Sequence, residues 1–200
     1  YFHTINISQV QTNLINKTCD VETTVTNSAP VVNAMADVTI PKGTAFVLKG
    51  SATDADNDVL EYNWEQVDNA TVAITKNNIG LTTTGASFRS KPGQSVPERF
   101  FPMFSSVMNE GLRIPDKWES VPMVARTMNF RLTVRDYNVD KPQTSFATQK
   151  VIVGADGPFQ ITSAKIYTNM TPPVITWDVA KTNAAPYNVA NVKIDYTMDN

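Results

Sequence analysis

The strongest constraint on the fold is the alternation of side chains in residues 59–67. One face of an extended chain here carries Leu60, Tyr62, Trp64 and Gln66. The other face carries Val59, Glu61, Asn63 and Glu65. Because successive side chains of a β-strand point to opposite faces, this pattern predicts a half-buried strand with Trp64 as its core anchor.

Similar patterns recur along the chain. Residues 129–135 place Phe130, Leu132 and Val134 on one face, which predicts a second long strand. Shorter strands are expected at residues 31–32, 37–40, 45–52 and 146–153, with a turn at residues 41–43. Short strands separated by turn residues favour an all-β sandwich over a fold of alternating strands and helices.

The pattern divides the chain into five parts. Residues 1–18 carry apolar side chains at mixed, helix-like spacing and are expected to form an amphipathic helix that needs a partner surface. Residues 19–29 are polar and form a linker, and residues 30–155 form the sandwich. Within it, residues 75–123 are predicted to be an ordered insertion. Residues 156–200 are expected to start a second, truncated β module, with strands at residues 161–163, 174–179 and 189–196.

The insertion is unusually rich in aromatic residues, which are Phe88, Phe100, Phe101, Phe104 and Trp118. A polar linker would not carry so many, so the segment is expected to pack against the sandwich. The alternative is an exposed platform that binds carbohydrate or peptide. Burial of Phe100, Phe101 and Phe104 favours packing, whereas a coplanar exposed row favours the platform.

Composition excludes several classes of function. The net charge of −2 leaves no basic surface for nucleic acid, and no apolar run has the length needed for membrane insertion. His3 is the single histidine, so a His-rich zinc site or a Ser-His-Asp arrangement is not expected in the chain. Glu61 and Glu65 lie about 13 Å apart along a strand, too far for a glycosidase pair.

The acidic turn after residue 53 is the best candidate for a metal site. Asp54, Asp56 and Asp58 alternate along it, and carboxylate oxygens on a tight turn suit Ca²⁺. In a sandwich this turn lies at the same pole as the turn after residue 135, so Asp136 and Asp140 can approach it. The linker residues Asn27 and Ser28 are expected at that pole too. The alternative is a solvated turn held by hydrogen bonds from the aspartates to nearby backbone.

Cys19 is the single cysteine, close to the start of the chain. In a secreted protein an odd cysteine pairs outside the segment or stays a free thiol, and both alternatives remain open. The first residue is not Met, and no leader pattern follows it, which suggests an excised piece of a larger protein.

Long stretches of the chain resemble one family. The matching stretches are residues 27–37, 40–48, 50–66, 88–90, 99–102, 124–136, 157–159, 176–179 and 190–194. They resemble the region that follows the catalytic domain in secreted bacterial reprolysin-like zinc metallopeptidases, and they cover almost the whole chain. The acidic turn also resembles PKD-type and cadherin-like modules, which implies an Ig-like β-sandwich.

The resemblance implies how the chain relates to a parent enzyme. Residues 1–8 resemble the last helix of the catalytic domain, and Cys19 would pair with a cysteine of that domain. The zinc ligands and catalytic glutamate of the family lie upstream, so the chain itself carries no catalytic residue. By analogy with PKD-type modules, the candidate calcium ligands are Asn27, Ser28, Asp54, Asp56, Asp58 and Asp136.

The sequence therefore predicts a non-catalytic accessory or spacer module of a secreted or cell-surface zinc metallopeptidase. Calcium would stabilise it, and its partners would be the upstream catalytic domain and the protein substrate. The alternative is a cell-surface adhesion or carbohydrate-binding module.

Overall fold

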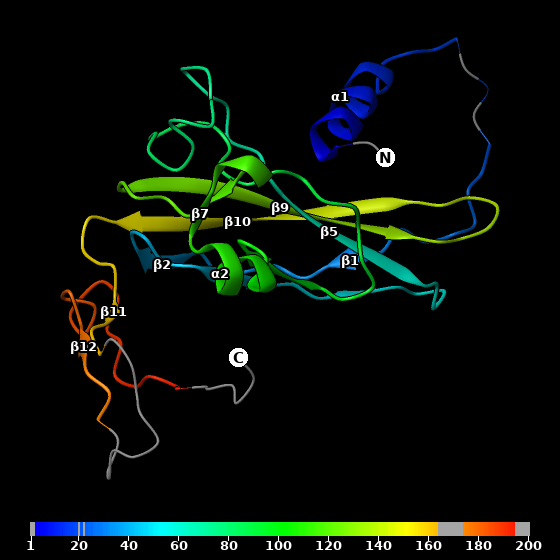
Figure 1. Cartoon of the computed structure of the whole chain (residues 1–200). Coiled ribbons are helices and arrows are strands. Elements are labelled where there is room, and N and C mark those ends of the chain that lie inside the picture. Colours follow the sequence, from blue (N-terminus) through cyan, green and yellow to red (C-terminus); the bar gives the residue numbers. More distant parts are fainter. Residues whose placement is uncertain (1–2, 20, 22, 164–173, 195–200) are drawn as a thin grey trace.

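The computed structural model describes residues 3–19, 21, 23–163 and 174–194. Its regular structure is mostly strand, with two short α-helices, so the predicted all-β class is confirmed (Figure 1). The helices are α1 (Thr4–Leu14), α2 (Phe104–Glu110) and the 3-10 turn η1 (Pro115–Lys117). The strands are β1 (Val31–Val32), β2 (Val38–Pro41), β3 (Phe46–Lys49), β4 (Ala52–Thr53), β5 (Leu60–Gln66), β6 (Glu98–Phe101), β7 (Arg113–Ile114), β8 (Glu119–Ser120), β9 (Arg126–Asp136), β10 (Thr144–Gly154), β11 (Gln160–Ile161) and β12 (Trp177–Asp178).

The largest sheet has four strands in the order β2-β10-β9-β5. β9 and β10 form a long antiparallel hairpin, and β5 pairs antiparallel with the other edge of β9. β2 runs parallel to β10, with Val38 beside Val151. The register of β5 on β9 places Leu60 opposite Asp136, so the start of β5 and the end of β9 lie at the same pole.

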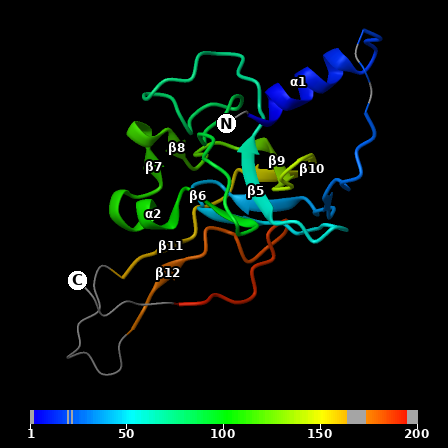
Figure 2. The same ribbon diagram turned by 90° about the vertical axis from the view of Figure 1, so that its right-hand side faces the viewer.

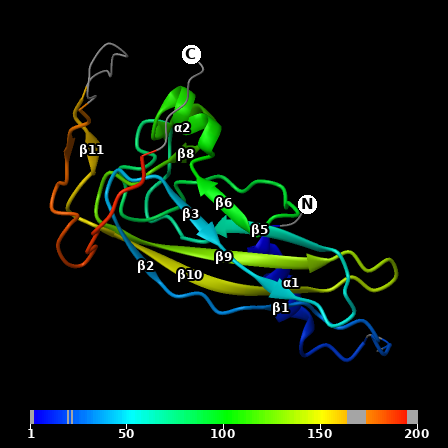
Figure 3. The same ribbon diagram turned by 90° about the horizontal axis from the view of Figure 1, so that it is seen from below.

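A two-stranded sheet of β3 and β6 faces the four-stranded sheet across the core (Figure 3). Aromatic contacts join the two layers: the Phe130 ring centroid on β9 lies 4.8 Å from that of Phe101 on β6 and 5.7 Å from that of Phe46 on β3. The buried core residues are Leu48, Trp64, Phe88, Phe101, Met128, Phe130, Leu132, Val134, Val151 and Val153. The predicted inward face of residues 129–135 and the core role of Trp64 are thereby confirmed.

Two expectations about individual strands are wrong. β5 is not half-buried along its whole length, because Asn63 and Glu65 on its outer face are each only 2% exposed. The N-terminal end of α1 contacts Glu65 and contributes to its burial. Second, the region treated as an insertion includes β6, which pairs with β3 and completes the second layer of the core.

Helix α1 lies on the outer face of the four-stranded sheet, opposite the core. Figure 1 shows it above β9 and β10, with β2 and α2 below them. The chain then loops away from α1 and returns to the pole where β5 starts. Neither α-helix in the described part of the chain has the length and apolar character that a membrane crossing needs.

The C-terminal part contains the small β11–β12 pair, which lies below β6 in Figure 2. It contacts the end of β10: a Cβ added to Gly154 would lie 1.8 Å from the Tyr187 Oη atom. The strand expected over residues 189–196 is wrong for residues 189–194, which form no strand. Residues 195–196 lie outside the described part of the chain.

Candidate functional site

The acidic turn connects β4 to β5 at one pole of the fold. Asp54, Asp56 and Asp58 each offer a carboxylate oxygen, and these oxygens lie within 4.8 Å of one another. Asn57, inside the turn, has a φ of 61°, a left-handed conformation that asparagine tolerates better than most residues. This backbone reversal directs the alternating carboxylates toward one point.

Asp54 is central to the turn. Its Oδ1 accepts hydrogen bonds from the backbone N–H groups of Asp56 (2.9 Å) and Asp58 (3.2 Å). These are the bonds that the solvated-turn alternative requires. Its Oδ2, however, is buried and has no hydrogen-bond partner among the described residues. A buried carboxylate oxygen without a partner is costly, and a cation would satisfy it.

The linker reaches the same pole, as the sequence predicts. The backbone N–H of Ser28 donates to Asp56 Oδ2 at 2.6 Å. The Asn27 side-chain amide donates to Asp136 Oδ2 at 2.8 Å and to the Lys141 carbonyl at 3.0 Å. Asp136, only 1% exposed, also accepts from the Gln143 N–H at 2.7 Å. The six candidate calcium ligands therefore meet at this pole.

Asp140 is not brought into the cluster. Within the described residues, the carboxylates close enough to share an ion are those of Asp54, Asp56 and Asp58, and Asp140 is exposed. Asn138, which the sequence pattern does not single out, bridges the linker and the acidic turn instead. Its amide nitrogen donates to Asp58 Oδ2 at 3.1 Å and to Asn27 Oδ1 at 3.3 Å.

The six candidates have different capacities as ligands. The three turn carboxylates are converging hard oxygen donors, which suits Ca²⁺ with its six to eight oxygen ligands at roughly 2.3–2.6 Å. Both oxygens of Asp136 already accept hydrogen bonds, so its present role is to hold Asn27 and the β9–β10 turn. From the linker, the side-chain and carbonyl oxygens of Asn27 already accept hydrogen bonds from Asn138 and Gln143. The donor set fits calcium better than zinc, which prefers nitrogen and sulfur.

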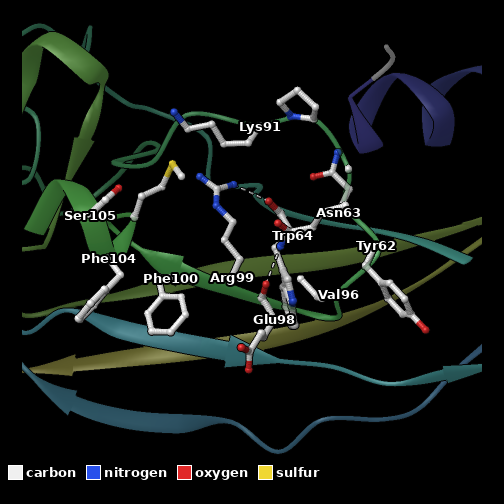
Figure 4. Close-up of a pocket in the computed structure, with 14 residues that line it drawn as sticks. Tyr62, Asn63, Trp64, Lys91, Val96, Glu98, Arg99, Phe100, Phe104 and Ser105 are labelled. Atoms are coloured by element: carbon white, nitrogen blue, oxygen red, sulfur yellow. Dashed lines mark hydrogen bonds between the residues drawn. The ribbon is translucent and has the colours of Figure 1, made fainter. Parts of the chain in front are cut away.

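A second feature is an apolar cleft of about 540 Å³ between β6, α2 and residues 91–96 (Figure 4). Its rim carries Val96, Phe100, Met103 and Phe104, which are 42–61% exposed. Its floor includes Trp64, whose Nε1 donates to the Pro97 carbonyl at 3.1 Å. An apolar cleft with a few fixed polar groups is the usual form of a site for an apolar side chain or small ligand.

One residue that lines this cleft, Arg99, belongs to a buried ion pair. Arg99 on β6 donates to Glu119 Oε1 at 3.0 Å, and their side chains are 8% and 1% exposed. Arg99 also donates to the carbonyls of Trp64 and Arg89 at 2.7 Å each. The other Glu119 oxygen accepts from the Met103 N–H at 3.2 Å. The pair thus ties β6, β8 and the start of α2 to β5.

The aromatic residues of this region divide into two groups. Phe88 and Phe101 are 2% and 0% exposed, so the packing expectation is confirmed for them. It is wrong for Phe100 and Phe104, which are 42% and 61% exposed. Their rings lie 5.8 Å apart at an interplanar angle of 53°, so they do not form the coplanar row that the platform requires. Phe100 points outward because the inward positions of β6 are occupied by Arg99 and Phe101.

The single histidine and the single cysteine, which were also considered as functional residues, lie away from the acidic pole. His3, just before α1, has its Nδ1 2.7 Å from Glu65 Oε1. Cys19 is an exposed free thiol in the linker, and its pairing outside the segment stays a prediction.

A search of known protein families finds no matching family model, and no curated protein matches the chain.

Proposed function

We propose that the chain is a non-catalytic accessory module of a secreted bacterial zinc metallopeptidase of the reprolysin-like type. In this proposal the two layers form an Ig-like, PKD- or cadherin-like β-sandwich, and zinc and the catalytic residues belong to the upstream domain. The observation that carries the proposal is that the linker is bonded to the acidic pole. The Ser28 N–H donates to Asp56, and the Asn138 side chain donates to both Asn27 and Asp58. The long stretches that resemble this family support the parentage.

Calcium at Asp54, Asp56 and Asp58 would stiffen the linker where it joins the sandwich. The Ser28 N–H already binds the Asp56 carboxylate, so an ion held by the turn would fix that carboxylate and its linker contact together. The module would then space and orient the catalytic domain. The apolar cleft is the feature that supports a contact with protein substrate.

Calcium binding is tested by isothermal titration calorimetry on the wild-type chain and on Asp54→Asn, with Asp140→Asn as the matched control. Asp140 lies at the same pole but outside the cluster. We expect the wild type and Asp140→Asn to bind alike, and Asp54→Asn to bind at least about tenfold more weakly, because it loses one charged ligand. Equal binding by all three proteins would rule out the turn as the site.

Parentage is tested by reading the coding sequence on the N-terminal side of Tyr1. We expect a His-Glu-x-x-His helix there, with its two histidines one turn apart on one face to hold zinc. Its absence would reject the metallopeptidase proposal. Chelator-sensitive proteolysis by the chain alone would equally contradict a non-catalytic role.

A second candidate function is an adhesion or carbohydrate-binding module. The exposure of Phe100 and Phe104 beside the cleft favours it, whereas their 53° tilt does not suit stacking on a flat sugar chain. Substituting both with Ala and measuring retention on immobilised polysaccharides and on denatured protein separates the two functions. Retention on polysaccharide that depends on both rings would favour the alternative.

A further inference from the structure

Glu65 is a carboxylate buried on the outer face of the sheet, opposite the core. It is 2% exposed, and ionisable side chains are rarely buried to this degree unless they are paired. Its partners lie near the N-terminus of the chain. The Glu65 Oε2 atom accepts a hydrogen bond from the backbone N–H of Thr4 at 2.8 Å, and its Oε1 atom lies 2.7 Å from His3 Nδ1. The N–H groups of the first turn of a helix have no partner within the helix, and the Thr4 N–H of α1 donates to the Glu65 carboxylate instead. The helix dipole favours an acidic group at this end.

Arg131 completes the arrangement from the neighbouring strand. It lies directly opposite Glu65 in the β5–β9 register. Its guanidinium donates to Ser8 Oγ at 2.7 Å and to Thr4 Oγ1 at 3.3 Å, and it lies 4.1 Å from the centre of the Phe146 ring. Thr4 and Ser8 are one helical turn apart, so one face of α1 meets one cross-strand pair.

Apolar burial does not account for this contact. Within α1, only Thr4 is buried and only Ile7 and Ser8 are half-buried. The other apolar side chains of the helix are more than half exposed, namely Ile5, Val10 and Leu14. An isolated helix of 11 residues is marginal in water, so the polar contacts of its first turns are what hold it against the sheet.

We propose that Glu65 and Arg131 form a docking site for the N-terminal segment and hold α1 in a fixed orientation on the module. The described residues between Gln9 and Thr26 are exposed, so the segment is attached at two points, this site and the acidic pole. Two attachments fix the orientation of the segment relative to the module, whereas a single attachment would let the segment rotate about it. A role for the docking in orienting an upstream domain rests on the proposed function. The docking of α1 on the sheet does not depend on that function.

Hydrogen–deuterium exchange of the 200-residue chain tests the docking. Compared with the wild type, Glu65→Gln and Ser8→Ala are expected to speed exchange across α1 roughly tenfold to a hundredfold, the factor for losing a hydrogen bond to a charged group. Ser8→Ala is the sharper variant, because alanine raises intrinsic helix propensity and cannot speed exchange by weakening the helix itself. It also leaves the sheet untouched if Glu65→Gln fails to fold.

Glu61→Gln is the matched control, since Glu61 lies on the same strand and face but contacts Arg135 and Tyr137. Unchanged α1 exchange in both test variants would overturn the proposal. So would exchange in the wild type as fast as in a free peptide of residues 1–19. Asp54→Asn in the same experiment reports on calcium through residues 24–28, so failure of the docking and failure of the calcium proposal are seen separately.

Discussion

Removing Glu119 tests whether the buried ion pair organises the region around the cleft. Glu119→Ala deletes the acceptor of Arg99 and of the Met103 N–H, and leaves the Arg99 guanidinium at 8% exposure without its carboxylate. Breaking one partner of a buried pair costs about 3–5 kcal/mol. Because single domains have only about 5–15 kcal/mol of stability, the variant is expected to lose a large fraction of its stability.

Equilibrium unfolding in urea, followed by circular dichroism, measures this cost. With a slope of about 2 kcal/mol per molar urea, the midpoint is expected to fall by roughly 1.5–2.5 M. Glu110→Ala is the control, because its ion pair with Lys117 is exposed and is worth at most about 1 kcal/mol. A midpoint for Glu119→Ala within the range of the control would refute the reasoning, since the buried pair would then contribute no more than a surface one.

Two further predictions concern packing and titration. Gly50→Ala would place a methyl group 2.1 Å from Leu132 Cδ2, so we expect a loss of about 1–3 kcal/mol in the same urea experiment, and an unchanged midpoint would contradict the packing. The hydrogen bond from Tyr137 to the Glu61 carboxylate raises the pKa of the Tyr137 phenol above 10.0 by favouring its neutral form. Stability from this bond is therefore present below pH 10 and is lost as pH rises through the folded-state pKa. In Glu61→Gln that phenol should ionise at lower pH in an absorbance titration, and an unshifted curve would contradict the assignment.

The strand pattern predicts much of the four-stranded sheet because its signal is local. Alternation in residues 59–67 and 129–135 reflects one buried face, and that face is filled by Trp64, Phe130, Leu132 and Val134. The site at the pole is predictable for a related reason. Antiparallel pairing of β5 with β9 brings the start of one strand to the end of the other, whatever the length of chain between them.

The sequence pattern does not predict β6, because its inward positions hold Arg99 and Phe101. A charged residue at an inward position interrupts the alternation of apolar and polar side chains that marks a strand. Arg99 is tolerated there because Glu119 reaches it from β8, which is a tertiary contact and leaves no local signal. The burial of Glu65 is missed for the same reason, since its partners lie 61 and 62 residues away at the start of α1. Such polar pairs become visible once the topology is known.

Thermal unfolding with and without calcium tests the proposal that the acidic turn binds calcium and thereby fixes the linker. At a calcium concentration a hundred times Kd, binding to the folded state adds about 2.7 kcal/mol. For a chain of this size that corresponds to a rise in Tm of roughly 5–11 °C, which a chelator should reverse and Asp54→Asn should reduce to about half or less. An identical Tm in 10 mM calcium and in chelator would contradict the account and leave the turn as a solvated loop.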